Sequence, residues 1–287
     1  MEREANRDQF EFLRQLSSDP SNTVIGIVRD KATTDKKISE ELDRRSNIHV
    51  LQADLLDYAA IENAAKCSAK ITGGSLDYLV ANAGYVSHWD AYEPIGVLLS
   101  RGNDPKQLED DFLKSFKTNV IANIHLFNLF IPLLLKSNIK KVIALSTGNA
   151  DLDPINNFDV EVAPGYSISK AAMNVAVAKF SAQYKKQGVL FMSICPGMVE
   201  TGHHKDGEEL AHFYIKSNIS DIRTATPEQM QSLGGLVQKF MQYAPHFTGP
   251  ATPEAAIKDV ISVWERASVE NGDGGSYVSH HGNKQWL

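Results

Sequence analysis

Cysteine is scarce in this chain, where Cys67 and Cys195 are the only two among 287 residues. Two cysteines cannot form a disulfide framework, and their spacing matches no zinc-binding pattern. The paired histidines at 203–204 and 280–281 are adjacent in sequence, so the two side chains of each pair point different ways, and no carboxylate completes a ligand set. We expect solvated side chains there and no metal. The composition therefore fits a protein of a reducing compartment.

Long apolar runs and an excess of positive charge are also lacking. The most apolar window, Ile121 to Leu135, is interrupted by two asparagines, a histidine and a proline, so it is too polar to span a bilayer. The first eight residues lack the apolar core of a signal peptide. The net charge of −6 argues against nucleic-acid or anionic-membrane partners. We expect a cytoplasmic protein.

Short apolar runs alternate with helical patterns along the chain, which is typical of a parallel sheet with crossover helices. The expected strands are Thr23–Val28, Ile48–Leu51, Leu76–Ala81, Lys141–Leu145, Leu190–Cys195 and Tyr277–Ser279. The expected helices are Gln9–Leu16, Ala59–Lys70, Pro105–Phe116, Val120–Lys136, Ser167–Lys186 and Pro253–Ser268. Thr252 is the expected N-cap of the last helix. The pattern predicts an α/β fold with a doubly wound parallel sheet.

One domain over residues 1–287 is expected, since this length and a hydrophobic content of 43% support a single sizeable core. Residues 202–250 are polar and have no strand signal. We interpret this segment as a substrate lid before the last helix and strand.

Tyr166 and Lys170 are four residues apart on one expected helix, so their side chains project from the same face. A nearby ammonium favours the phenolate and lowers the pKa of a phenol, which ordinarily titrates near 10. The pair therefore predicts an acid–base group that works near neutral pH.

Four further motifs follow in a set order along the sequence. They are Ala81-Asn82-Ala83-Gly84, the Asn119 of Lys-Thr-Asn-Val, Leu145-Ser146-Thr147-Gly148, and Pro196-Gly197-Met198-Val199-Glu200-Thr201. With Tyr166 and Lys170 they resemble the short-chain dehydrogenase/reductase family, over the chain from about Gln9 to its end. The resemblance implies a Rossmann-like fold and a nicotinamide cofactor.

The resemblance also implies roles for individual residues. The catalytic set would be Asn119, Ser146, Thr147, Tyr166 and Lys170. The cofactor would contact Arg29, Asp54, Leu55, Asn82, Ala83, Gly84, Tyr166, Lys170, Pro196, Gly197, Val199 and Thr201.

The identity of the catalytic hydroxyl is open between two neighbours. The family usually has two serines here, and the second faces the substrate carbonyl. That second position is Thr147, which we favour, with Ser146 as the alternative. The separation from Thr147 to Tyr166 is longer than usual in the family, so we expect an extra loop near Asp153–Glu161 at the cleft mouth.

The family's first strand and its glycine-rich phosphate turn are missing, since no glycine precedes Gly26 and Asp8-Gln9 stands where glycines belong. That strand is central in the family's sheet, so its loss predicts two unpaired strand edges. We expect that the natural protein carries the strand upstream, which sequencing the 5′ end of the transcript would test. If Met1 is the true start, we expect poor folding and weak dinucleotide binding.

Arg29 precedes Asp30 at the end of the second strand of the family's fold, and an arginine there accommodates the 2′-phosphate of NADP. NADP(H) is therefore expected rather than NAD(H). An acidic residue at this place would bind the ribose of NAD, but Asp30 could instead cap the loop that follows. The implied function is reduction of a ketone or aldehyde to an alcohol, or the reverse.

The implied partners are a small-molecule carbonyl or alcohol substrate and further copies of this chain in a homodimer or homotetramer. Similarity of the C-terminal motifs to fungal reductases suggests a role in secondary metabolism. The alternative is a non-catalytic dinucleotide-fold sensor or scaffold that has lost its cofactor cradle. Dehydration or epimerisation with the same Tyr and Lys is a weaker alternative.

Overall fold

The computed structural model describes residues 7–87, 89–91, 93–99, 104–200, 235 and 238–287. Its strands are β1 (Val24–Val28), β2 (Ile48–Gln52), β3 (Tyr78–Ala81), β4 (Lys141–Leu145), β5 (Leu190–Cys195) and β6 (Tyr277–Ser279). Its longer helices are α1 (Arg7–Leu16), α2 (Lys31–Glu41), α3 (Tyr58–Ile71), α4 (Pro105–Phe116), α5 (Ala122–Leu134), α6 (Leu152–Phe158), α7 (Pro164–Tyr184) and α10 (Pro253–Arg266). Short turns of helix are η1 (Ile95–Val97), η2 (Lys117–Ile121), η3 (Gly148–Ala150) and η4 (Lys185–Gln187).

Strand pairing divides the described chain into two parallel sheets. One contains β1 and β2, and the other has the order β3-β4-β5-β6. β1 pairs with β2 alone and β3 with β4 alone, so one edge of each is left without a strand partner in the described chain. The two unpaired strand edges predicted from the sequence are therefore present in the described chain.

Alternate strand residues reach opposite helical layers, as expected for a doubly wound sheet. Val142 and Ala144 of β4 pack with α3, α5 and α7. Ile143 and Leu145 point to the other face and pack with α10. The Rossmann-like α/β architecture predicted from the sequence is therefore confirmed.

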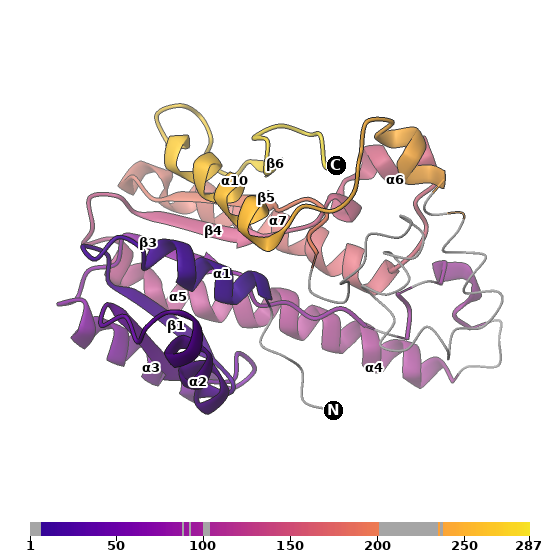
Figure 1. Cartoon of the computed structure of the whole chain (residues 1–287). Helices are drawn as coiled ribbons and strands as arrows, with labels where there is room; N and C mark the ends of the chain where they lie inside the picture. The colour runs from indigo at the N-terminus through magenta and orange to yellow at the C-terminus, as the bar shows by residue number, and fades with distance from the viewer. Residues whose placement is uncertain (1–6, 88, 92, 100–103, 201–234, 236–237) are drawn as a thin grey trace.

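Helix α1 lies between strand β1 and helix α10 and contacts both of them (Figure 1). Phe12 stacks on Trp264 of α10, with ring centroids 5.6 Å apart. Leu13 packs on the β1 side, where a Cβ added to Gly26 would lie 3.3 Å from Leu13 Cδ2. A side chain at position 26 would thus crowd α1, which explains a glycine inside a strand.

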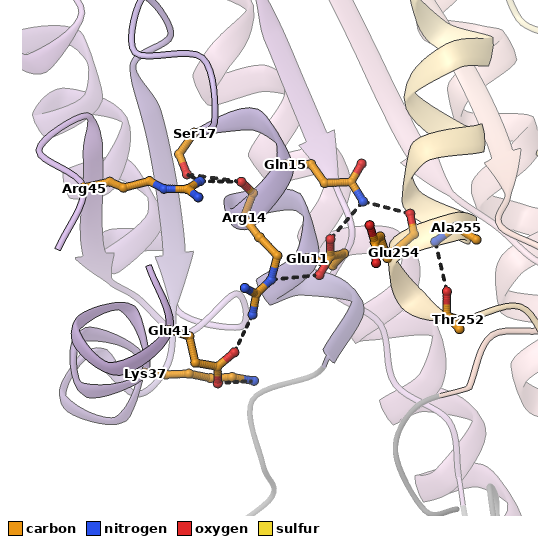
Figure 2. Close-up of polar contacts among 10 residues, drawn as sticks. All are labelled: Glu11, Arg14, Gln15, Ser17, Lys37, Glu41, Arg45, Thr252, Glu254 and Ala255. Carbon is orange, nitrogen blue, oxygen red and sulfur yellow. Dashed lines mark hydrogen bonds and ion pairs between the residues drawn. The ribbon is translucent and has the colours of Figure 1, made fainter. Parts of the chain in front are cut away.

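Polar contacts also connect α1 to helices on its two sides (Figure 2). Arg14 of α1 pairs with Glu41 at the end of α2. Gln15 Nε2 donates to the carbonyl oxygen of Glu254 at 2.8 Å, which ties α1 to the first turn of α10. Because these contacts lead from one helix to different neighbours, α1 connects the two sheets at a place where no described strand does.

Three predicted elements need correction. α2 was not predicted: its buried residues are only Thr34 and Ile38, so its apolar periodicity is weak, yet Asp30 caps it. The loop expected near 153–161 contains a two-turn helix, α6, capped by Asp151. α7 begins at Pro164, three residues earlier than predicted, because proline is well suited to the first helical position.

The remaining elements lie within a few residues of their predicted bounds, and Thr252 is the N-cap of α10, accepting from Ala255 N at 3.2 Å. In the described parts of the chain, no helix combines the length and apolar character needed to cross a membrane. The predicted lid at 202–250 falls mostly outside the described residues and stays a prediction.

Candidate active site

The carboxyl ends of β3, β4 and β5 meet at one edge of the four-stranded sheet, because the strands are parallel. Asn82 follows β3, Ser146 and Thr147 follow β4, and Pro196 follows β5. Residues separated by more than a hundred positions are thereby brought to one edge, where open α/β sheets bind ligands.

Lys170 is buried at this edge with its charge directed to the end of β4. Its Nζ donates to the carbonyl oxygen of Leu145 at 2.7 Å and lies 5.8 Å from the ring centroid of Tyr166. The side chain is 5% exposed, and burial lowers its pKa to about 8. The ammonium is thus still the main form at neutral pH, beside the half-buried Tyr166.

Asn119 is fully buried in the π-helical turn η2, and its side-chain amide organises the loop after β3. Its Oδ1 accepts from Tyr85 N at 2.7 Å, while its Nδ2 donates to Tyr85 O at 2.8 Å and to Ser169 Oγ at 2.9 Å. The Ser169 hydroxyl donates in turn to the carbonyl oxygen of Tyr166. Asn119 therefore links the loop after β3 to the first turns of α7.

Gly84 lies between the predicted catalytic side chains of Lys170 and Asn119. A Cβ at this position would lie 3.4 Å from Lys170 Nζ and 3.5 Å from Asn119 Oδ1. Nearby, the Nδ2 of Asn82 is buried without a hydrogen-bond partner. Such an orphaned donor beside a bare stretch of backbone suits a polar ligand that approaches the main chain closely.

The two candidate hydroxyls differ in accessibility. Ser146 is 5% exposed, and its N–H continues the sheet by donating to Ile194 O at 2.8 Å. Thr147 is half-buried, and its Oγ1 accepts from Asn149 N at 3.3 Å. The Thr147 hydroxyl is thus engaged as the N-cap of η3, whereas the Ser146 Oγ is buried without a hydrogen-bond partner.

The loop after β5 turns through a glycine in the left-handed region, which allows a close approach. Gly197 has a φ of +78°, and a Cβ there would lie 2.6 Å from His280 Cε1. Val199 forms a bridge with Ala251, so this loop is pinned next to the start of α10. Pro196 is half-buried, and the predicted contact residue Thr201 lies outside the described residues.

The adenine-side residues lie on the separate two-stranded sheet. Arg29 is exposed at the end of β1. The Asp30 carboxylate caps α2, accepting from Thr33 N at 2.9 Å and Thr33 Oγ1 at 2.6 Å, and these bonds lower its pKa. Asp54 is exposed and accepts from Leu56 N in a tight turn, while the neighbouring residue 55 packs into the core.

Asp90 is a buried residue near the site that the sequence did not reveal. Its Oδ2 accepts from Gly165 N at 2.7 Å, one residue before Tyr166, so it satisfies an open amide at the start of α7. Burial raises its pKa to about 6. No local pattern marks this aspartate, because its role depends on a contact across 75 residues.

Comparison with known proteins identifies the family. A family model described as short chain dehydrogenase matches residues 11–210. The chain belongs to the short-chain dehydrogenase/reductase family, whose members are oxidoreductases with nicotinamide dinucleotide cofactors. It is 63% identical over 278 residues to the short chain dehydrogenase virK of Hypocrea virens, covering 97% of this chain and 95% of virK.

Two further comparisons agree. The chain is 52% identical to the short-chain dehydrogenase/reductase iacC of Pestalotiopsis fici, again over 97% of this chain and 95% of the relative. The structure is similar to the NADPH-bound carbonyl reductase from chicken fatty liver, with a TM-score of 0.69 and 19% identity over 97% and 94% of the two chains. That likeness shows the shared fold.

The described residues fit a dinucleotide at its nicotinamide end. There the orphaned Asn82 Nδ2, the bare backbone of Gly84 and the buried ammonium of Lys170 are gathered.

Proposed function

We propose that the protein is an NADP(H)-dependent oxidoreductase that reduces a ketone or aldehyde to an alcohol, or catalyses the reverse reaction. One observation carries the proposal: the Lys170 ammonium is buried at the end of β4, 5.8 Å from the Tyr166 ring. A buried cation beside a phenol, at a strand end that also carries a hydroxyl, is suited to proton transfer to a carbonyl oxygen.

The roles follow from position. A nicotinamide dinucleotide, when bound, supplies the hydride for the carbonyl carbon. Tyr166 donates its phenolic proton to the carbonyl oxygen, and the Thr147 hydroxyl, with Ser146 as the alternative, donates a hydrogen bond to that same oxygen. The Lys170 ammonium stabilises the phenolate that remains, because opposite charges in a poorly solvated site attract strongly.

Asn119 stays in the proposed catalytic set. Its amide holds both the N–H and the C=O of Tyr85, and so keeps Gly84 beside Lys170. We assign it the role of ordering the water that returns a proton to the site. We propose that the remaining predicted contact residues surround the dinucleotide. They are Asp54, Leu55, Asn82, Ala83, Pro196, Gly197, Val199 and Thr201.

The preference for NADP(H) is supported by Arg29 and Asp30. Asp30 is engaged as the cap of α2, whereas the exposed Arg29 is available to a 2′-phosphate. The chicken carbonyl reductase of the same fold binds NADPH. The fungal origin of the two relatives supports a place in secondary metabolism, and the cytoplasmic location remains a prediction from the sequence.

A homodimer or homotetramer is proposed from an apolar surface on α4, η2 and α7. Its exposed members are Leu113, Phe116, Ile121, Ile168 and Val175. Exposed apolar side chains on neighbouring helices are typical of subunit contacts. Sedimentation of the wild type and of Leu113→Glu tests this, with a smaller species expected for the variant.

The decisive experiment follows NADPH oxidation with a panel of ketones and aldehydes. Tyr166→Phe should lower turnover by about 10²- to 10⁴-fold, because the proton donor is lost. Tyr184→Phe, which removes a hydroxyl from the far end of the same helix, should retain wild-type turnover. Equal turnover of Tyr166→Phe and the wild type would remove Tyr166 from its role.

A second candidate, a non-catalytic sensor or scaffold that has lost its cofactor cradle, is favoured by the unpaired strand edges of β1 and β3 in the described chain. This candidate predicts no turnover with any carbonyl in the panel. Calorimetric titration with NADPH and NADH separates the two candidates further, since a protein without a cofactor cradle should bind neither dinucleotide.

A further inference from the structure

Trp286 is the second-to-last residue of the chain and is nevertheless buried, at 3% exposure. Residues near a chain end are usually poorly ordered unless specific contacts hold them. Here the backbone N–H of Trp286 donates to Tyr243 Oη at 2.8 Å, and the Tyr243 hydroxyl donates to the carbonyl oxygen of Lys284 at 3.3 Å. The tail is therefore anchored on its outer side by the helix at 238–243.

The inner side of Trp286 contacts the loop that follows β4. A Cβ added at Gly148 would lie 2.6 Å from Trp286 Cβ, so only a glycine allows this approach. The indole Nε1 donates to Asp151 Oδ2 at 3.0 Å, and Lys284 Nζ lies 3.4 Å from the same oxygen. Two tail residues thus hold the carboxylate at the end of the η3 turn.

Tyr277 completes the contact with the same loop. Its ring stacks on Trp286 with centroids 4.5 Å apart, and its hydroxyl donates to the carbonyl oxygen of Thr147. Burial raises the pKa of Tyr277, so its hydroxyl keeps its proton and remains a donor. The loop from Thr147 to Asp151 is therefore held at both its ends by residues about 130 positions away in the sequence.

We infer that Tyr277, Lys284 and Trp286 form a C-terminal clasp that positions the Thr147–Asp151 loop, and with it the Thr147 hydroxyl that receives the substrate oxygen. The inference rests on the proposed function of Thr147. The three clasp residues are positioning residues, since they contact the loop's main chain and the Asp151 carboxylate. A displaced hydroxyl would lower turnover while leaving cofactor contacts elsewhere intact.

The test compares kcat and the KM for NADPH in Tyr277→Phe and Trp286→Phe. Each variant should lose about 10- to 100-fold in kcat, as expected for a misplaced catalytic group, with KM for NADPH within about twofold of wild type. Trp264→Phe is the matched control, because this buried tryptophan of α10 stacks on Phe12 of α1 and lies near Lys141 at the start of β4, the strand end opposite the Thr147–Asp151 loop. Unchanged kcat in both clasp variants would overturn the inference.

Two further readouts separate positioning from other roles. If Tyr277 were itself an acid or base, Tyr277→Phe would alter the shape of the pH–rate profile, whereas a positioning role lowers the plateau and keeps the shape. Asp151→Asn keeps an acceptor for the indole N–H and should retain most of the wild-type kcat. Asp151→Ala removes the acceptor and should match the loss seen in Trp286→Phe.

Hydrogen exchange makes the inference independent of turnover. In the clasp variants, amides of residues 147–151 should exchange faster than in wild type, while those of β4 and β5 stay protected. If the wild type reduces no carbonyl, the proposed function fails, and the exchange pattern alone decides whether the clasp orders the loop. Exchange at 147–151 equal to that of wild type and Trp264→Phe would overturn the clasp.

Discussion

The two sheets of this protein differ in how completely they are tied to their surroundings. The four-stranded sheet β3–β6 is covered on both faces and carries the proposed catalytic set at one edge. The two-stranded sheet β1–β2 carries the proposed adenine-side residues and is joined to the rest chiefly by α1 and α3. The proposed catalytic residues therefore lie in the part of the fold that has continuous strand pairing.

No described strand pairs with the second edge of β1 or of β3, so main-chain hydrogen bonds do not join the two halves there. Side chains of α1 make the connection between the halves instead. Side-chain contacts bury apolar area, but they do not satisfy the row of amides and carbonyls on an open strand edge. We therefore expect the two halves to differ in their sensitivity to mutation.

Lys170→Met should produce the largest effect on the catalytic half. Removing the buried ammonium should lower kcat by about 10²- to 10⁴-fold, the range for loss of an acid–base function. Steady-state assays with NADPH measure this. Lys179→Met, an exposed position on the same helix, should behave as wild type. A Lys170→Met enzyme of normal activity would contradict the proposed chemistry.

Phe12→Ala should have the largest effect on the connection between the halves. Phe12 is 6% exposed and stacks on Trp264, so truncation should reduce the free energy of unfolding by about 3–5 kcal/mol. Urea unfolding measures the loss. Phe116→Ala, at a position 41% exposed, should cost far less. Equal losses in the two variants would argue against α1 as the bridge.

The pH dependence of turnover tests the role of Lys170 in the catalytic half. Its pKa lies at about 8 against an ordinary value of 10.5, so the ammonium is lost as pH rises through 8. Turnover should fall about tenfold between pH 8 and 9.5, because the deprotonated fraction grows accordingly. Between pH 8 and 10.5 the unfolded chain binds more protons at this site, so stability from this group rises with pH.

Above pH 8, turnover should fall while the stability contributed by Lys170 rises. This difference distinguishes a loss of activity by titration of Lys170 from a loss by unfolding. Thermal unfolding measured over the same pH range should show no matching loss from Lys170. If activity and melting temperature fall together above pH 8, titration of Lys170 is not the cause of the activity loss.

Arg29→Ala should have a smaller effect, confined to the adenine-side half. Loss of one charged contact to a 2′-phosphate should raise KM for NADPH about tenfold, with little change for NADH. Arg44→Ala is a suitable control, because this arginine bonds the hydroxyl of Ser39 and lies beyond α2. An equal change for both dinucleotides would show that Arg29 does not select the phosphate.

Glu41→Gln should have the smallest effect. The Arg14–Glu41 pair links α1 to α2, but both side chains are more than a third exposed, at 37% and 40%. Exposed pairs contribute about 0–1 kcal/mol, so unfolding by urea should shift by less than about 1 kcal/mol. A larger shift would show that polar contacts, rather than Phe12, connect the halves.

Much of the fold was predictable because its periodic signals are strong. The bounds of β4, β5, β6 and α4 match the predicted ranges, since buried strands and a capped amphipathic helix are marked by local residues. α2 was missed, because only two of its residues are buried. The predicted loop near 153–161 was wrong, since the short helix α6 depends on its Asp151 cap and on packing.

Site residues were predictable where a motif carries them and hidden where a distant contact does. The spacing of Tyr166 and Lys170 places them on one helix face by helical geometry alone. Asp90, by contrast, contacts Gly165, and Trp286 contacts Gly148, across separations that leave no mark on local sequence. Their positions follow from how loops meet at the sheet edge.

The amino-acid sequence by itself determined the order of the strands and helices, the family, and the helical pairing of a phenol with an ammonium, because these depend on residues a few positions apart. Only the tertiary structure decided that Lys170 is buried enough to lose part of its basicity, that α1 joins two separate sheets, and that the C-terminal tail holds the loop of Thr147. Burial and long-range contacts are properties of the packed chain, since each requires surfaces that come together only on folding.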